Sequence, residues 1–127
     1  VDWNQRFQAS NGERTVDLDG NGSPGAIRQK IEDLVVGHIY RIAFDLAGNP
    51  EGPPTVKLLR VNIDGRLFPF SFNTTGKTPE DMGWTTKLIQ FRYSGKNPWV
   101  TFAIGEPNDG AAFYGAFIDN VKVACVS

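Results

Sequence analysis

Seven polar or aromatic side chains alternate with apolar residues in the chain, on the side opposite the expected core. They are Arg41, Asp45, Arg60, Asn62, Gln90, Arg92 and Trp99. Guanidinium, carboxylate and amide groups pair with sugar hydroxyls, and an indole ring stacks on the C–H face of a sugar ring. The set therefore predicts a carbohydrate-binding surface. An ordinary solvated face of an antiparallel sheet shows the same pattern, and the sequence alone leaves both interpretations open.

Acidic residues form a second candidate site. The segment 17–22, Asp-Leu-Asp-Gly-Asn-Gly, matches the first half of an EF-hand loop, in which oxygen ligands for calcium alternate. The twelfth position is Arg28 instead of the bidentate Glu, which favours a turn at the end of a strand. Asp119 lies near the start of the last apolar segment, where its carboxylate needs a cation or backbone donors. Asp17, Asp19 and Asp119 are therefore candidate calcium ligands, with hydrogen bonds to loop amides as the alternative.

Motifs that would indicate catalysis are missing from the sequence. It contains no Ser-His-Asp set, no HExxH motif and no phosphate-binding loop. The single histidine, His38, falls on the expected apolar face of its strand, which favours a structural role. A glycosidase needs two facing carboxyl groups in one cleft, and the sequence places no such pair. We therefore expect a protein that is not an enzyme.

Charge and composition limit the partners. Thirteen basic residues against fourteen acidic residues give a net charge of −1, which excludes a basic nucleic-acid-binding protein by bulk charge. No apolar run approaches the roughly 20 residues of a membrane-spanning helix. The only cysteine, Cys125, cannot form a disulfide within the chain, so it is either a small apolar residue ending the last strand or an intermolecular thiol. The 127 residues are expected to form one domain, 1–127.

Period-two alternation predicts an all-β fold. Strands are expected at 14–18, 26–32, 38–46, 56–64, 67–72, 85–93, 99–104 and 117–124, with a brief helical turn over 78–82. Pro69 cannot donate to a strand ladder, which places its strand at the edge of a sheet or at a bulge. Eight short strands at roughly ten-residue spacing predict a two-sheet antiparallel sandwich.

Four segments also resemble the motifs of a known family, in the same order along the chain. They are 15–29 (Thr-Val-Asp-Leu-Asp-Gly-Asn-Gly-Ser-Pro-Gly-Ala-Ile, with Gln29), 44–50 (Phe-Asp-Leu-Ala-Gly-Asn-Pro), 75–85 (Thr-Gly-Lys followed by Met-Gly-Trp-Thr) and 117–123 (Phe-Ile-Asp-Asn-Val-Lys-Val). They resemble the choice-of-anchor C family, secreted bacterial relatives of a plant cell-wall protein family. The resemblance implies a galactose-binding-like jelly roll that is secreted or at the cell surface and is lectin-like in binding a polysaccharide or other glycan. It also implies a structural calcium ion at Asp119.

The resemblance implies one difference at the N-terminus. Family members begin with a strand upstream of the segment that matches Val1-Asp2-Trp3, and that strand pairs near the last strand. This chain is therefore expected to lack its first strand, which would leave an edge open to a strand of another chain. The alternative function is thus a structural surface protein whose copies assemble into a filament, sheath or lattice, with Cys125 as a bridging thiol.

Overall fold

The computed structural model describes residues 2–4, 15–17, 26–52, 55–104 and 115–127. These residues form nine strands and no helix: β1 (Asp2–Asn4), β2 (Thr15–Asp17), β3 (Ala26–Lys30), β4 (Ile39–Gly48), β5 (Val56–Ile63), β6 (Arg66–Asn73), β7 (Thr85–Arg92), β8 (Trp99–Ile104) and β9 (Ala116–Cys125). All strand pairs are antiparallel. The all-β expectation is confirmed, and most strand bounds agree within one or two residues.

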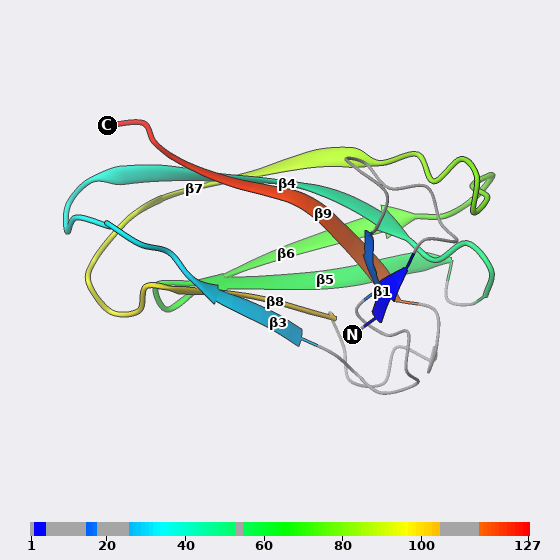
Figure 1. The fold of residues 1–127 in the computed structure, drawn as a ribbon, viewed down its shortest axis with the longest axis horizontal. Coiled ribbons are helices and arrows are strands. Elements are labelled where there is room, and N and C mark those ends of the chain that lie inside the picture. The colour runs from blue at the N-terminus through cyan, green and yellow to red at the C-terminus, as the bar shows by residue number, and fades with distance from the viewer. Residues whose placement is uncertain (1, 5–14, 18–25, 53–54, 105–114) are drawn as a thin grey trace.

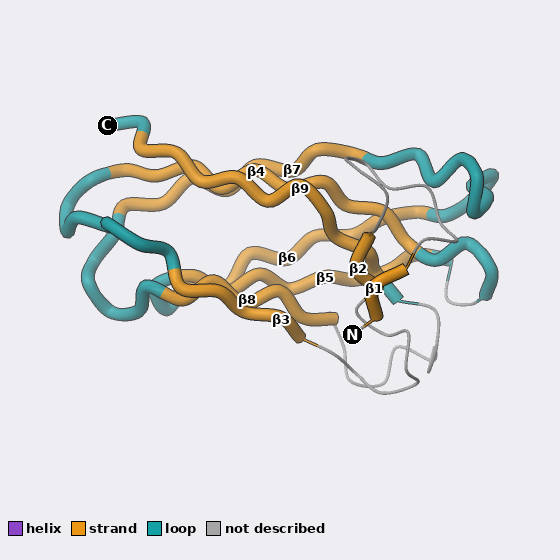
Figure 2. Tube along the Cα trace, in the orientation of Figure 1, coloured by secondary structure: helices purple, strands orange, loops and turns teal. Residues whose placement is uncertain are grey.

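The strands form two stacked layers (Figures 1 and 2). Sheet A has the order β1-β2-β9-β4-β7, and sheet B has the order β3-β8-β5-β6. Strands adjacent in the sequence therefore often lie in different sheets, as in β3 and β4 or β7 and β8. The predicted two-sheet sandwich is confirmed.

The core lies between the sheets, where alternate side chains of strands such as β4 and β5 point inward. Phe44 of β4 is fully buried and contacts two rings of sheet B edge-on, Phe70 and Phe102, each with its ring centroid 5.2 Å away. Edge-to-face packing at this distance adds to the free energy gained by burying the rings. These contacts join β4 of sheet A to β6 and β8 of sheet B.

Local features of the sequence explain several details. Pro69 lies in β6, one of the two edge strands of sheet B, which agrees with the prediction. The helical turn expected over 78–82 is wrong, because Thr78 and Asp81 exchange backbone hydrogen bonds of 3.1 and 3.0 Å in an isolated bridge. His38, expected on the core face, is exposed just before β4, which begins at Ile39. No helix within the described ranges is long and apolar enough to span a membrane.

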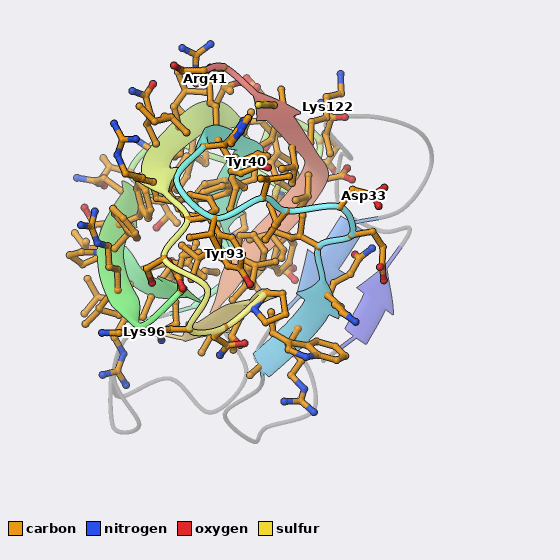
Figure 3. All side chains as sticks on the ribbon, turned by 90° about the vertical axis from the view of Figure 1, so that its left-hand side faces the viewer. Asp33, Tyr40, Arg41, Tyr93, Lys96 and Lys122 are labelled. Atoms are coloured by element: carbon orange, nitrogen blue, oxygen red, sulfur yellow. The ribbon has the colours of Figure 1, made fainter. Side chains whose placement is uncertain are left out.

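One end of the sandwich is closed by the connections 31–38 and 93–98. Figure 3 looks at this end and shows Tyr40 and Tyr93 pointing between the sheets, with Arg41 and Lys122 pointing outward. The Tyr40 hydroxyl accepts a hydrogen bond of 2.7 Å from the Val35 backbone N–H. The ring therefore fills the end of the core while its polar atom holds the 31–38 connection.

Candidate functional site

The structure divides the predicted carbohydrate-binding residues between two opposite surfaces. Four of them lie on β4 and β7 and face outward from sheet A: Arg41, Asp45, Gln90 and Arg92. The other three lie on β5 and β8 and face outward from sheet B: Arg60, Asn62 and Trp99. The expectation that all seven share one face is wrong, because alternation along a strand separates inside from outside without indicating the sheet.

The polar groups on sheet A hold parts of the fold together. Asp45 and Asp119 are cross-strand partners at a register shift between β4 and β9, where Asn120 has a positive φ of 54°. Asp45 accepts hydrogen bonds from the Thr86 hydroxyl at 2.8 Å and from the Asn120 side-chain amide at 3.4 Å. These bonds stabilise the irregular pairing of β4 with β9.

The candidate calcium ligands are only partly described. Asp17 pairs with Phe117 through the backbone, while its side chain and all of Asp19 lie outside the described residues. Asp119 is half-buried, and its Oδ1 accepts a hydrogen bond of 2.8 Å from the Asn120 backbone N–H. Among the side chains that the structure describes, no three His, Cys, Asp or Glu residues come together as a metal site. Calcium binding stays a prediction.

The outer face of sheet B brings Trp99 together with basic and polar side chains. In the strand register, Trp99 lies beside Lys30 of β3, and Thr101 lies between Arg28 and Asn62. The Trp99 side chain is 36% exposed, and the Arg28 Cζ atom lies 4.6 Å from its ring centroid. This cation–π contact restrains the indole while Arg28 itself stays exposed. An aromatic ring and hydrogen-bond donors are thus available together on one surface.

A buried carboxylate positions the loop that leads into Trp99. Asp64 is 5% exposed and accepts backbone hydrogen bonds from Ser94 at 2.6 Å, Lys96 at 2.9 Å and Asn97 at 3.2 Å. The Asn97 side chain in turn accepts a hydrogen bond of 3.0 Å from the Trp99 backbone N–H. The start of β8, and with it the position of Trp99, therefore depends on Asp64.

Asp64 lies in a hairpin turn between β5 and β6, from which its carboxylate contacts the 94–97 loop. Asp64 and Gly65 have positive φ values of 52° and 76°, as the two central residues of a type I′ hairpin turn require. Burial of Asp64 opposes its ionisation, but hydrogen bonds from Ser94, Asn97 and Lys96 outweigh burial and hold the pKa of this carboxyl below its ordinary value of 3.8. The carboxylate is therefore ionised at neutral pH.

Sequence reasoning missed three residues of this region: Arg28, Lys30 and Asp64. Arg28 and Lys30 alternate with the apolar Ile27 in a segment that was expected to be a strand. This alternation could have predicted that both side chains face outward. The Asp64-Gly65 pair is recognisable as a turn in the sequence. The hydrogen bonds from the 94–97 loop to Asp64, however, join residues about 30 positions apart. No local pattern indicates such a contact.

Comparison with solved structures shows related folds. A family 16 carbohydrate-binding module is 17% identical with a TM-score of 0.57, over 91% of this chain and 79% of that one. The EclA C-terminal domain, a sugar-binding protein, is 17% identical with a TM-score of 0.59, over 93% and 82%. A CBM35 from Cellvibrio japonicus Abf62 is 14% identical with a TM-score of 0.57, over 99% and 86%. These likenesses establish a jelly-roll sandwich.

The sequence comparisons assign the family. No curated protein matches the sequence significantly. A family model described as "Protein of unknown function (DUF642)" matches residues 2–124. The choice-of-anchor C resemblance stays a prediction. Because the matched segment covers nearly the whole sequence, the chain belongs to the DUF642 family.

Proposed function

We propose that this chain is a non-catalytic, extracellular carbohydrate-binding domain, and that the outer face of sheet B is its ligand surface. The observation that carries the proposal is the partly exposed Trp99 ring, restrained by Arg28 and flanked by Lys30 in the strand register. An indole fixed in this way binds the apolar face of a sugar with little loss of side-chain entropy. Nearby donors then select the hydroxyl pattern.

The solved structures of similar fold support the proposal. They are two carbohydrate-binding modules and a sugar-binding protein. The outer face of sheet A is a weaker candidate, because Arg92 and Asp45 use their polar atoms within the protein. Arg92 donates a 2.6 Å hydrogen bond to the Gly37 carbonyl, and Asp45 accepts from Thr86.

A glycan array tests the proposal. We expect the wild-type protein to bind at least one polysaccharide, and we expect Trp99→Ala to weaken that binding by about tenfold or more, the loss typical of removing an aromatic anchor. Leu88→Ala is the matched control, because Leu88 is 60% exposed on the outer face of sheet A. Equal binding by wild type and Trp99→Ala, or no binding to any glycan, would contradict the proposal.

A second candidate function, self-assembly by strand pairing, is favoured by the open side of the sandwich. Within the described residues, β2 pairs with β9 only at Phe117 and Ile118, so 121–125 has a single strand neighbour, β4. Val121 and Val123 are 42% and 39% exposed, and with Ile31 they line a cavity of about 230 Å³. A strand from a second copy of this chain would pair with this edge and cover the valines.

Light scattering after size-exclusion chromatography tests the second candidate. We expect oligomers whose proportion rises with concentration, and we expect Val123→Lys to shift them toward monomer because a charge on the inner side of the edge opposes strand addition. Leu88→Lys on sheet A, a site away from this edge, should leave the distribution unchanged. A wild-type protein that stays monomeric at every concentration rules out self-assembly.

A further inference from the structure

The two sheets differ in charge although the chain as a whole is nearly neutral. The strands of sheet B contain five basic residues and no acidic residue: Arg28, Lys30, Lys57, Arg60 and Arg66. The strands of sheet A contain four basic and four acidic residues. The charged residues in the strands of sheet B are therefore all basic, although the net charge of the chain is −1.

Three of the basic side chains face outward around β8. Lys57 is fully buried and donates to the Gly52 carbonyl at 2.8 Å, so it takes no part in the surface. Arg28 and Lys30 lie on β3, on one side of β8, and Arg60 lies on β5, on the other side. Two strand spacings separate β3 from β5, a distance of about 10 Å.

The outward residues of β8 itself are small beyond Trp99. Thr101 lies between Arg28 and Asn62, and Ala103 lies beside Arg60 in the register. Short side chains on the middle strand leave the guanidinium groups of the neighbouring strands accessible from above. Both arginines thus border one strip of surface that begins at Trp99.

The described strands of sheet B offer these charges no acidic partner. Neither Arg28, Lys30 nor Arg60 forms an ion pair with another residue of the described part of the chain, and the four strands supply no carboxylate. Like charges gathered on one face repel each other, and an anionic ligand removes that repulsion on binding. Guanidinium groups also bind carboxylate and sulfate oxygens through paired hydrogen bonds.

We propose that the outer face of sheet B binds a polyanionic polysaccharide, with a sugar ring on Trp99 and the carboxylate or sulfate groups of the polymer at Arg28 and Arg60. This inference rests on the proposed carbohydrate binding and specifies the class of glycan. Lys30 adds a positive charge beside Trp99 in the strand register and strengthens attraction over longer distances. Binding is expected to weaken with added salt, because the attraction is electrostatic.

Affinity electrophoresis with matched polymers tests the inference. The two pairs are polygalacturonate with its carboxyl-reduced form, and dextran sulfate with dextran. Polyphosphate serves as a polyanion without sugar. We expect an anionic polysaccharide to retard the protein and its neutral counterpart not to do so. The pair that responds identifies carboxylate or sulfate as the ligand group.

The double variant Arg28→Gln/Arg60→Gln should weaken binding by about tenfold or more, the effect expected for losing charge-assisted hydrogen bonds. The control Arg41→Gln/Lys122→Gln makes the same charge change on sheet A and should change binding less than twofold.

The possible failures are distinguishable. Equal retardation by the charged and neutral polymers overturns the inference and leaves the proposed carbohydrate binding intact. No retardation by any polysaccharide overturns both. Retardation by polyphosphate that Trp99→Ala leaves unchanged identifies a general anion-binding surface, and it also overturns the inference. Thermal melting of each variant confirms that a loss of binding does not come from unfolding.

Discussion

Replacement of Asp64 by Asn should destabilise the fold measurably, although the two side chains have nearly the same shape. Asp64 is buried in a hairpin turn, and its Oδ1 accepts from Lys96 and Asn97 while its Oδ2 accepts from Ser94. Asn also tolerates the positive φ of this position. The amide keeps one acceptor oxygen but places an NH₂ donor against the Ser94 N–H.

The size of the effect follows from the bonds lost. One hydrogen bond to a charged group contributes about 1.5–3 kcal/mol, so Asp64→Asn should lower the free energy of unfolding by about 2 kcal/mol. With an unfolding entropy of roughly 2.1 cal/mol/K per residue over this chain, that loss lowers the melting temperature by about 8 °C. Asp64→Ala loses all three bonds and adds strain at positive φ, for a loss of about 4 kcal/mol.

The same variant has a defined pH dependence. Because folding lowers the pKa of Asp64, its contribution is complete above the ordinary value of 3.8 and is lost as the pH falls through the folded-state pKa. Melting curves of wild type and Asp64→Asn should therefore differ most at pH 7 and converge in acid. If the two proteins melt within 1 °C of each other at pH 7, or if their difference does not shrink in acid, the carboxylate does not hold the 94–97 loop.

Four further outcomes are expected. Phe44→Ala should cost about 3–5 kcal/mol in urea unfolding, because Phe44 is fully buried between the sheets; a loss below about 1 kcal/mol would place it outside the core. Gly48→Ala should destabilise by about 1–3 kcal/mol, since its Cβ would overlap the Lys57 side chain, whereas an unchanged melting temperature would show that this side chain yields freely. Cys125 is exposed, so an aromatic disulfide reagent should label it without denaturant, and labelling that requires unfolding would contradict its position. Calcium should raise the melting temperature of wild type but not of Asp119→Asn if the predicted site forms, and identical curves with and without calcium would reject it.

Alternation of apolar residues predicted the strands well, because the core lies between two sheets and strands such as β4 and β5 bury alternate side chains over most of their length. In 38–46, 56–64 and 99–104 the inward positions agree with the burial of Phe44, Val61 and Phe102. Only His38 breaks the first of these patterns, because the chain is still in a turn there. Pro69 predicted an edge strand for a similar reason, since its missing N–H is tolerated where no neighbour needs it.

The candidate site was harder to predict because it depends on strand order. Arg41 and Arg60 have equivalent outward positions in their own strands, and yet they lie on opposite sides of the molecule. The sheet to which a strand belongs is set by pairing between distant segments, which one-dimensional alternation does not record. The basic character of sheet B could not be predicted for the same reason. Its charged residues come from strands that lie apart in the sequence, between residues 26 and 73, and only strand pairing brings them together.

The most direct test of the central claim is a titration followed by ¹H–¹⁵N spectra, using a polysaccharide fragment retained in the glycan array. Sugar binding at the outer face of sheet B predicts that the Trp99 indole N–H signal shifts with the backbone signals of Arg28 and Thr101. The Trp84 indole, half-buried against the core, should stay in place. Shifts confined to sheet A, or no shift of Trp99 at saturating ligand, would contradict the claim.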